Sequence, residues 1–334
     1  MHLALYIAVI CIATGVIWTG SAWLESSSAR LAGHYGLPPV VQGSVIAAVG
    51  SSFPEMSTTV IATLAHGEFD LGVSVIVGSA IFNILVIPGV AGLASGGLRS
   101  DRELVYKDAQ FYLTSVAVLL LTFSLAVIYH PTGEAGGLSG EIDRPLALIP
   151  AGLYGLYIFL QHQETADYRA PAAQPTSPGR QWVLLSLGLG LIVGGVEALV
   201  RSAIWLGDHF GTPTFLWGLT VLAAATSLPD LFISLKAARR GQAAVSLGNV
   251  LGSNIFDLLV AVPAGVLIAG TATVDFAVAA PMMGVLTLAT IVLFTMLRTR
   301  LMLTRAESGV LLALYAVFVG WMVLETLGVT RVVA

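Results

Sequence analysis

The chain has little charge: Asp, Glu, Lys and Arg make up 10% of its 334 residues, whereas hydrophobic residues make up 56%. A soluble domain of this size needs far more charge to cover its surface, so the composition excludes an ordinary water-soluble fold. A single cysteine, Cys11, excludes an intrachain disulfide and leaves a thiolate metal site without a second ligand. The net charge is only −4, and no basic run indicates nucleic-acid binding.

The chain contains long, nearly charge-free apolar runs, and the length of each is close to the roughly 20 residues that cross a bilayer as a helix. We predict ten spans, at 3–24, 38–64, 71–96, 109–129, 145–161, 181–206, 214–237, 243–269, 274–297 and 306–328. The first run is interpreted as a retained helix, because it lacks the basic segment that opens a signal peptide. The predicted fold class is therefore an all-α integral membrane protein with ten transmembrane helices.

Lys and Arg are distributed unevenly among the connections, and cytoplasmic loops are enriched in these two residues. With the N-terminus outside, the inward connections contain twelve of the fifteen basic residues, including Arg99, Arg102 and Lys107. The outward connections carry acids instead, such as Glu68 and Asp70. The distribution predicts that both termini lie outside, in what would be the plasma (inner) membrane of a prokaryote.

One motif occurs twice, about 175 residues apart, and places acids inside apolar segments. The first copy reads Gly50-Ser51-Ser52-Phe53-Pro54-Glu55 and, further on, Gly78-Ser79-Ala80-Ile81-Phe82-Asn83. The second reads Ala225-Thr226-Ser227-Leu228-Pro229-Asp230 and then Gly252-Ser253-Asn254-Ile255-Phe256-Asp257. Acids in lipid-spanning segments are expensive and therefore usually functional, and duplicated broken helices mark the binding site of a secondary transporter.

A segment rich in Pro and Ala, 164–180, lies between the two copies and lacks hydrophobic periodicity. We interpret it as an exposed cytoplasmic linker. It separates a first unit of five spans, 1–163, from a second unit of five, 181–334. Because five is odd, the second unit must enter the membrane from the opposite side. The two units are thus predicted to form an inverted repeat about an axis in the membrane plane.

The repeated motif gathers oxygen atoms. Pro54 and Pro229 each free a carbonyl four residues earlier in a helix, and in a membrane that carbonyl must find protein, water or an ion. Side chains that follow the same pattern in both copies are Ser51, Ser52, Glu55, Ser79 and Asn83 in the first, and Thr226, Ser227, Asp230, Ser253 and Asp257 in the second. An all-oxygen set of this kind suits hard cations such as Ca²⁺, or several monovalent ions in its place.

The alternative interpretation is that the hydroxyls merely satisfy backbone groups at the proline kinks. For Ser52 or Ser227 taken alone, this alternative is as good as ion binding. For Glu55, Asp230 and Asp257 it is weak, because an unpaired buried carboxylate is expensive and these segments contain no basic partner.

On these motifs the chain resembles the cation/Ca²⁺ antiporter superfamily, and within it the sodium/calcium exchangers, over nearly its whole length. The resemblance implies a central Ca²⁺ site at Glu55 and Asp230, assisted by backbone oxygens at Ser51 and Thr226 and completed by Asn83 and Asp257. It implies flanking Na⁺ sites at two triplets, Ala48, Ser52 and Ser79, and Ala223, Ser227 and Ser253. It also implies that access alternates as the first and sixth spans slide across the bundle.

The chain departs from the family pattern at a few positions. Asp230 stands where many sodium/calcium exchangers have Glu, Ala225 stands where Gly is usual, and Ser51 stands where Thr is common. Asp230 and Asp257 resemble the potassium-dependent branch, although Asp at the second position also occurs in exchangers that ignore potassium. The use of K⁺ is therefore left open.

The leading hypothesis is a secondary active antiporter that exchanges Ca²⁺ for Na⁺, with no enzymatic activity and no cofactor beyond the transported ions. The alternative is calcium/proton or other cation/proton antiport through the same carboxylates, since buried carboxylates titrate. A third hypothesis, an intramembrane aspartyl protease, requires Tyr or Gly before each acid, whereas Pro229 and Phe256 precede Asp230 and Asp257. Flux measurements are needed to distinguish a passive cation channel from an antiporter.

Overall fold

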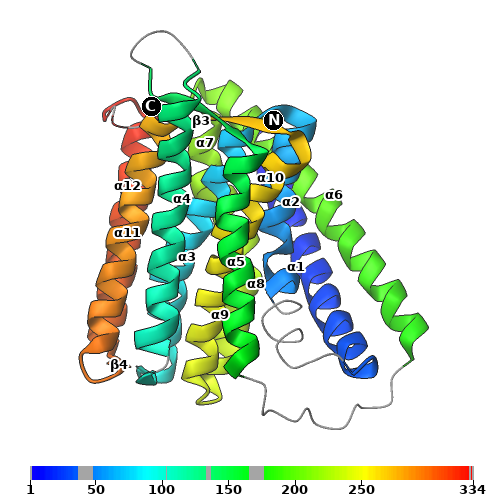
Figure 1. Cartoon of the computed structure of the whole chain (residues 1–334), viewed down its shortest axis with the longest axis vertical. Helices are drawn as coiled ribbons and strands as arrows, with labels where there is room; N and C mark the ends of the chain where they lie inside the picture. Colours follow the sequence, from blue (N-terminus) through cyan, green and yellow to red (C-terminus); the bar gives the residue numbers. More distant parts are fainter. Residues whose placement is uncertain are drawn as a thin grey trace.

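The computed structural model describes residues 2–36, 48–102, 104–132, 137–164, 177–330 and 332. The described chain is a bundle of helices, as predicted, most of which run between two ends of the molecule (Figure 1). The first half contains α1 (His2–His34), α2 (Ala48–His66), α3 (Phe69–Ser95), α4 (Ala109–Tyr129) and α5 (Arg144–Glu164). The second half contains α6 (Pro178–Phe210), α7 (Thr214–Trp217), α8 (Ala223–Arg239), α9 (Ala243–Phe256), α10 (Val262–Ala269), α11 (Phe276–Arg298) and α12 (Arg305–Thr326).

Three short π-helical stretches join or extend these helices. They are η2 (Leu104–Asp108) before α4, η3 (Gly218–Leu222) between α7 and α8, and η4 (Asp257–Ala261) between α9 and α10. A π turn widens the backbone spiral by one residue and is frequently found at functional sites. The last stretch begins at Asp257 and ends just before Pro263, which has no N–H to give to the ladder. The second motif therefore lies where the helix is irregular.

Within the described residues, eight helical segments are long and apolar enough to cross a membrane. They are His2–His34, Phe69–Ser95, Leu104–Tyr129, Pro178–Phe210, Thr214–Arg239, Ala243–Ala269, Phe276–Arg298 and Arg305–Thr326. The two other predicted spans correspond to α2 and α5, which are helical but more polar. α2 carries hydroxyls and the acid of the first motif copy, and α5 ends in the polar sequence Gln-His-Gln-Glu. The count of ten spans thus stays a prediction.

The predicted boundaries need correction at several helix ends. The start of the second span, 38–47, and most of the linker, 165–176, lie outside the described residues. Residues Pro178–Arg180, which we predicted to belong to the linker, form the first turn of α6, where proline is well tolerated. α1 continues to His34 rather than stopping near residue 24. The Ser28 hydroxyl donates a hydrogen bond to the carbonyl of Leu24 one turn earlier, so this polar side chain is accommodated inside the helix.

Two short antiparallel strand pairs join the first half to the second, and the all-α prediction missed them. β1 (Leu98–Arg99) pairs with β4 (Met302–Leu303), and β2 (Ser139–Asp143) pairs with β3 (Thr271–Asp275). The pairs lie at opposite ends of the bundle (Figure 1). β1 and β3 each follow the third predicted span of their half, and β4 and β2 each precede the fifth. A two-fold axis in the membrane plane would produce this arrangement, which supports the predicted inverted repeat.

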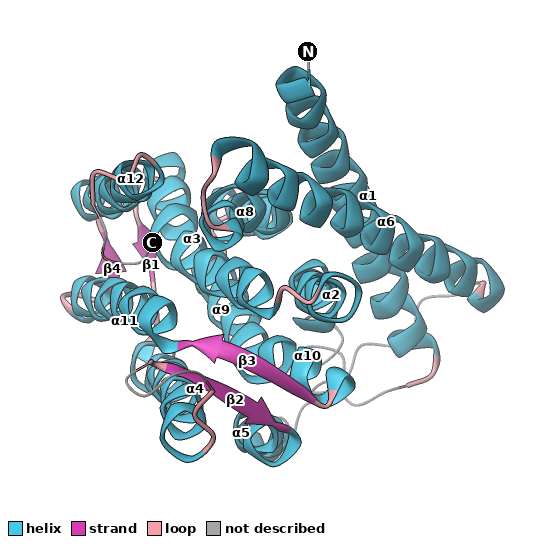
Figure 2. Cartoon of the chain, turned by 90° about the horizontal axis from the view of Figure 1, so that it is seen from above, coloured by secondary structure: helices cyan, strands magenta, loops and turns pink. Residues whose placement is uncertain are grey.

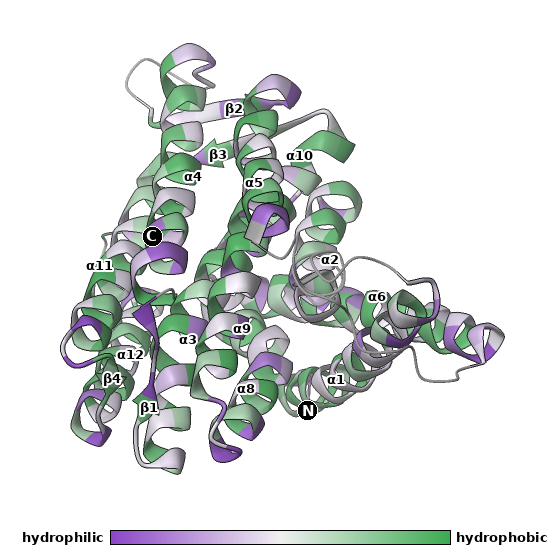
Figure 3. Ribbon diagram, turned by 60° about the horizontal axis from the view of Figure 1, so that its bottom comes forward, coloured by the Kyte–Doolittle hydropathy of each residue, from purple (hydrophilic) through white to green (hydrophobic). Residues whose placement is uncertain are grey.

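Charge differs between the two ends. Connections that carry Arg99, Arg240 and Arg298 lie at the end that bears β1 and β4, and Figure 3 shows this end with hydrophilic ribbon in its loops. The other end, which bears β2 and β3, carries acids such as Glu68 and Asp143. We refer to them as the basic end and the acidic end. The separation is the one that the positive-inside distribution predicts.

α1 and α6 lie side by side as a long tilted pair at one side of the bundle (Figure 2). A Cβ on Gly20 would lie 2.8 Å from the carbonyl oxygen of Gly188, and a Cβ on Gly188 would lie 2.8 Å from that of Gly20. A Cβ on Gly195 would lie 3.2 Å from the carbonyl oxygen of Ala13. Gly195 and Gly188 follow Gly20 and Ala13 by the 175 residues of the repeat, so the two contacts are equivalent in the two halves.

α3 is the central helix, and nearly all its residues from Phe69 to Gly92 are buried. Two of its glycines allow neighbouring segments to approach closely. A Cβ on Gly78 would collide with the carbonyl oxygen of Leu219, and one on Gly72 would lie 2.8 Å from the Cα of Thr59. The close approach brings the first motif on α2 and α3 against the second motif on α8.

Candidate ion-binding site

The predicted ligands converge where α2 and α3 meet α8 and α9, deep inside the bundle. The most exposed of the polar ones is Ser51, at 5%. The buried set comprises Ser51, Ser52, Glu55, Ser79, Asn83, Thr226, Ser227, Asp230, Ser253 and Asp257, together with Ala223. Ala48 is the first residue of α2, and its side chain lies outside the described part of the chain. The sequence therefore identified a group of side chains that the fold does bring together.

Hydroxyl groups join the two copies of the motif across the site. Ser51 and Ser253 have their Oγ atoms 3.1 Å apart, and Ser79 and Ser227 have theirs 2.7 Å apart. The Ser52 hydroxyl donates to the backbone carbonyl of Ser253 at 3.4 Å. Each contact connects a helix of the first half to a helix of the second. The copies thus form one site rather than two.

Glu55 projects into this set from the turn of α2 that follows Pro54. The Ser79 hydroxyl donates to its Oε1 at 3.4 Å, and Thr226 lies beside the same carboxylate. The Thr226 hydroxyl also donates to the carbonyl of Leu222 at 3.2 Å, so for this residue the backbone-satisfying alternative holds as well. The Oε2 atom of Glu55 is buried and has no hydrogen-bond partner among the described residues.

Asp230 occupies the matching position on α8. Asn249 donates to its Oδ1 at 3.4 Å, and the side chains of Ser253 and Asn83 also interact with this carboxylate. Sequence reasoning missed Asn249, although a signal was present. Asn249 precedes Ser253 by four residues and Asp257 by eight, so all three occupy one face of the helical segment.

Asp257 begins the π-helical stretch and is fully buried. The Ser52 hydroxyl is a close neighbour, yet within the described chain neither carboxylate oxygen has a hydrogen bond of good geometry. Asn83, its counterpart in the first copy, likewise keeps its Oδ1 without a partner while its Nδ2 donates to Asn254 at 3.0 Å. Buried oxygen atoms without donors are costly, and a bound cation, a water molecule or a proton would each satisfy them.

Electrostatics at the site is one-sided. Glu55 and Asp230 lie close enough to repel each other, and Asp257 is repelled by both. None of the ion pairs in the described ranges includes these three carboxylates. No three His, Cys, Asp or Glu side chains of those ranges cluster as a metal site, so the hydroxyl, amide and carbonyl oxygens are needed as ligands as well. Among the described residues, no positively charged side chain pairs with these carboxylates to offset their charge.

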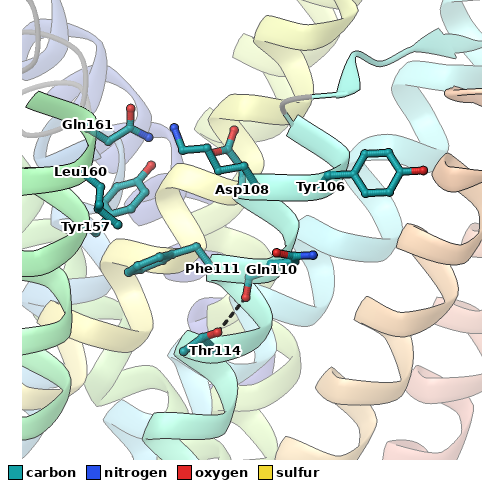
Figure 4. Close-up of a pocket in the computed structure, with 9 residues that line it drawn as sticks. Tyr106, Asp108, Gln110, Phe111, Thr114, Tyr157, Leu160 and Gln161 are labelled. Carbon is teal, nitrogen blue, oxygen red and sulfur yellow. Dashed lines mark hydrogen bonds between the residues drawn. The ribbon is translucent and has the colours of Figure 1, made fainter. Parts of the chain in front are cut away.

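Two pockets open near the ends of the helices and do not contain the predicted ligands. One, of about 310 Å³, lies at the acidic end beside Glu68 and Asp70. The other, of about 350 Å³, lies at the basic end, where Asp108 and Phe111 face Tyr157 and Gln161 of α5 (Figure 4). The polar side chains of the site are at most 5% exposed.

A charged group outside the site connects the α1–α6 pair to the rest of the bundle. Glu197 on α6 pairs with Arg201 four residues later, at 2.5 Å, a spacing that places both side chains on one helix face. The other carboxylate oxygen of Glu197 lies 3.1 Å from Nε2 of His66, at the end of α2. The contact with His66 was not predicted, because the two residues are 131 positions apart.

Comparisons with known proteins agree with this geometry. A family model described as "Sodium/calcium exchanger protein" matches residues 5–163 and 180–324. CaxA of Alkalimonas amylolytica, named as a candidate antiporter, is 30% identical over 260 residues, which cover 76% of this chain and 77% of the relative. The sodium/calcium exchanger MaX1 of Methanosarcina acetivorans is 24% identical over 269 residues, covering 72% and 76%.

Solved structures show the same fold. The sodium-calcium exchanger NCX_Mj, soaked with 2.5 mM Na⁺ and 0.1 mM Ca²⁺, aligns with a TM-score of 0.62 at 23% identity. The alignment covers 95% of this chain and 98% of that chain. The likeness extends over both halves of the bundle, including the helices that carry the two motifs.

Proposed function

The chain belongs to the sodium/calcium exchanger family, a family of transporters, and from that premise we propose that it exports Ca²⁺ in exchange for Na⁺. The observation that carries the proposal is that three buried carboxylates, Glu55, Asp230 and Asp257, lie near enough to repel one another and lack a basic partner among the described residues. Such a group is stable only when it is neutralised, and oxygen ligands select hard cations. A site that is negative when empty and shared by two ion types is the requirement for exchange.

In this proposal Glu55 and Asp230 hold Ca²⁺ between them. Backbone oxygens at Ser51 and Thr226 would add neutral ligands; each residue lies three positions before a proline, Pro54 or Pro229, in the turn where the helix lacks one N–H donor. Ca²⁺ accepts six to eight oxygen ligands with flexible geometry, so the shorter reach of Asp230 is compensated by a hydroxyl or carbonyl.

Na⁺ would occupy the flanks of the same site. One flank is formed by Ala48, Ser52 and Ser79, and the other by Ala223, Ser227 and Ser253. Asn83 and Asp257 complete the middle. Because the Ca²⁺ and Na⁺ positions share carboxylates, loading the site with Na⁺ supplies the charge that Ca²⁺ would otherwise supply. Competition for that charge couples the two fluxes. Asp257 is also the residue through which K⁺ would enter the cycle.

Alternating access would come from movement of the α1–α6 pair. The pair is held together by the glycine contacts of Gly20 and Gly188, whereas both strand pairs join other helices. We propose that the pair slides as one piece over the remaining helices. The basic end would face the cytoplasm and both termini the outside of a prokaryotic plasma membrane.

A second candidate function is Ca²⁺/H⁺ antiport through the same carboxylates. It is favoured by the unpartnered Oε2 of Glu55 and the two unpartnered oxygens of Asp257, which a proton neutralises as well as a metal ion does. The two candidates differ in what drives Ca²⁺ movement and not in which residues are used.

Reconstituted vesicles loaded with ⁴⁵Ca²⁺ test the proposal. Efflux from wild-type vesicles should require external Na⁺ and should stop when Na⁺ is replaced by choline at constant pH. Ca²⁺ movement driven by a pH gradient alone would overturn Na⁺ coupling in favour of proton antiport. Efflux that needs no counter-ion would indicate a channel. Glu55→Gln is the matched control, because it keeps the side-chain volume and removes the charge.

A further inference from the structure

Asn254 is a polar residue of the second motif that the ion site does not account for. It lies on α9 next to Ser253 and is fully buried. Its side chain crosses to the first half of the chain and makes hydrogen bonds there. Nδ2 donates to the carbonyl of Ala80 at 3.3 Å and to the Tyr112 hydroxyl at 3.1 Å, and Oδ1 accepts from Nδ2 of Asn83 at 3.0 Å.

The direction of these bonds is fixed by chemistry. A backbone carbonyl only accepts, so the Asn254 atom that faces Ala80 must be the NH₂ group. The carbonyl oxygen of Asn254 then faces Asn83, which must donate. The Asn83 NH₂ group therefore serves Asn254 and the neighbouring Asp230 carboxylate, and its oxygen, Oδ1, points away from Asn254, where it is buried without a partner among the described residues. A flipped Asn83 would place two N–H groups on that side.

The chain of bonds extends to the far side of the bundle. The Tyr112 hydroxyl on α4 is fully buried and also lies against Thr290 of α11. Thr290 gives its own proton to the carbonyl of Leu286 at 2.7 Å, so Tyr112 is left to donate to Thr290 and to accept from Asn254. A series of hydrogen bonds thus runs from the Leu286 carbonyl on α11 through Thr290, Tyr112 and Asn254 to Asn83.

The two halves differ at this point in a coordinated way. At the motif offset of 174, Asn254 corresponds to Ala80 and Asp257 corresponds to Asn83. A carboxylate has two acceptor oxygens and presents one in either orientation, so it needs no partner to set its direction. An amide has one acceptor and one donor group, so it does. The amide ligand Asn83 of the first half is bonded by Asn254 of the second, whereas the residue of the first half equivalent to Asn254, opposite the carboxylate Asp257, is Ala80.

We propose that Asn254 is a positioning residue that holds Asn83 with its carbonyl oxygen toward the transported cation, and that Tyr112 and the Ala80 carbonyl hold Asn254. The inference rests on the proposed function, because the direction of Asn83 matters only if a cation binds there. Without Asn254, the Asn83 amide is free to present N–H groups to the cation. Loss of a hydrogen-bonded buried partner of this kind changes affinity by about tenfold.

The test is a double-variant cycle on the full-length protein in vesicles. Asn254→Ala should raise the KM for Ca²⁺ by about tenfold, with a smaller effect on the maximal rate. Adding Asn83→Asp reproduces, with the halves exchanged, the native combination of a carboxylate ligand, Asp257, with an alanine, Ala80, at the equivalent orienting position. The double variant should recover most of the lost affinity, since a carboxylate needs no orienting partner. Tyr112→Phe should raise KM only about threefold, because the Ala80 carbonyl still accepts.

Each result has one interpretation. Wild-type vesicles that move no Ca²⁺ would contradict the proposed function, whereas an unchanged KM in Asn254→Ala with active wild type would overturn this inference alone. Failure of Asn83→Asp to restore affinity would also overturn it, because a purely structural defect is not repaired by a new carboxylate. If Asn254→Ala alone is unstable on size-exclusion chromatography, Tyr112→Phe and the double variant decide. Asn249→Ala, on the same helix but bonded to Asp230, is the matched control that Asn83→Asp should not rescue.

Discussion

The side-chain oxygens of Ser79 and Ser227 lie 2.7 Å apart, although 148 residues separate them in the chain. Ser79 belongs to the first copy of the motif and Ser227 to the second, and both are fully buried. Either hydroxyl can donate, so the pair can rotate its protons away when a cation needs lone pairs. The contact places the centre of the site at the boundary between the two halves, so a substitution in either half affects the whole site.

Removing the charge of the central pair should abolish Ca²⁺ transport. Glu55→Gln and Asp230→Asn each keep the shape of the side chain but replace one of the two carboxylates proposed to bind Ca²⁺ by a neutral amide, which is a weaker ligand for a hard cation. We expect ⁴⁵Ca²⁺ uptake in vesicles to fall to background in both. Glu68→Gln, which changes an acid at the acidic-end pocket, should keep most of the activity. Near-normal exchange in either central variant would refute the assignment of Glu55 and Asp230.

Asp257→Asn should change the dependence on monovalent ions more than the affinity for Ca²⁺. It makes the second half resemble the first, where Asn83 occupies the equivalent position. The variant also introduces an amide whose corresponding orienting position is Ala80, so we expect weaker binding of the monovalent ion by about tenfold or more. Titrating Na⁺ and K⁺ separately at fixed Ca²⁺ measures the effect. A shift confined to the Ca²⁺ KM would contradict this division of roles.

The contact between α1 and α6 should tolerate no side chain at Gly20. A Cβ there would lie 2.8 Å from the carbonyl oxygen of Gly188 and 2.9 Å from Ile192, so Gly20→Ala must push the helices apart. Overpacking of this kind destabilises by about 1–3 kcal/mol. Thermal unfolding in detergent should show a lower midpoint for Gly20→Ala. Gly15→Ala on the same helix, with no described atom within 4 Å, should match wild type. Equal midpoints for the two variants would show that the pair is not tightly held.

The proposed orientation predicts which end reacts with an impermeant thiol reagent. In a background of Cys11→Ser, which removes the single native cysteine, Thr273→Cys at the acidic end should be labelled in intact cells. Arg99→Cys at the basic end should be labelled only after permeabilisation. Both positions are exposed in the structure, so access to the reagent depends on the side of the membrane. The reverse pattern would invert the assignment of inside and outside.

The sequence predicted those parts of the fold that depend on local pattern. Apolar runs located the helices, and the doubled prolines, hydroxyls and acids located the site, because each copy carries its ligands within about one helical turn or at i and i+4. Polar residues misled the prediction of helix ends. The predicted first and sixth spans stop at residues 24 and 206, yet α1 and α6 continue through polar residues to His34 and Phe210.

What the sequence could not predict are contacts that depend on distant segments. β1 and β4 are two residues long, too short to show any alternation, and they form only because α3 and α12 bring them together. The role of Asn254 likewise depends on Tyr112, which lies 142 residues away. No spacing rule connects these two residues, so the hydrogen-bond partner became visible only in the folded chain.

The two strand pairs have a consequence for how the protein is assembled. Each pair ties one half to the other, one at either end of the bundle, and the site between them is built from both halves. The peptide connection between α5 and α6 is then not what holds the halves in register. Two separate polypeptides, one ending after α5 and the other beginning before α6, should find each other in the membrane and rebuild the complete site.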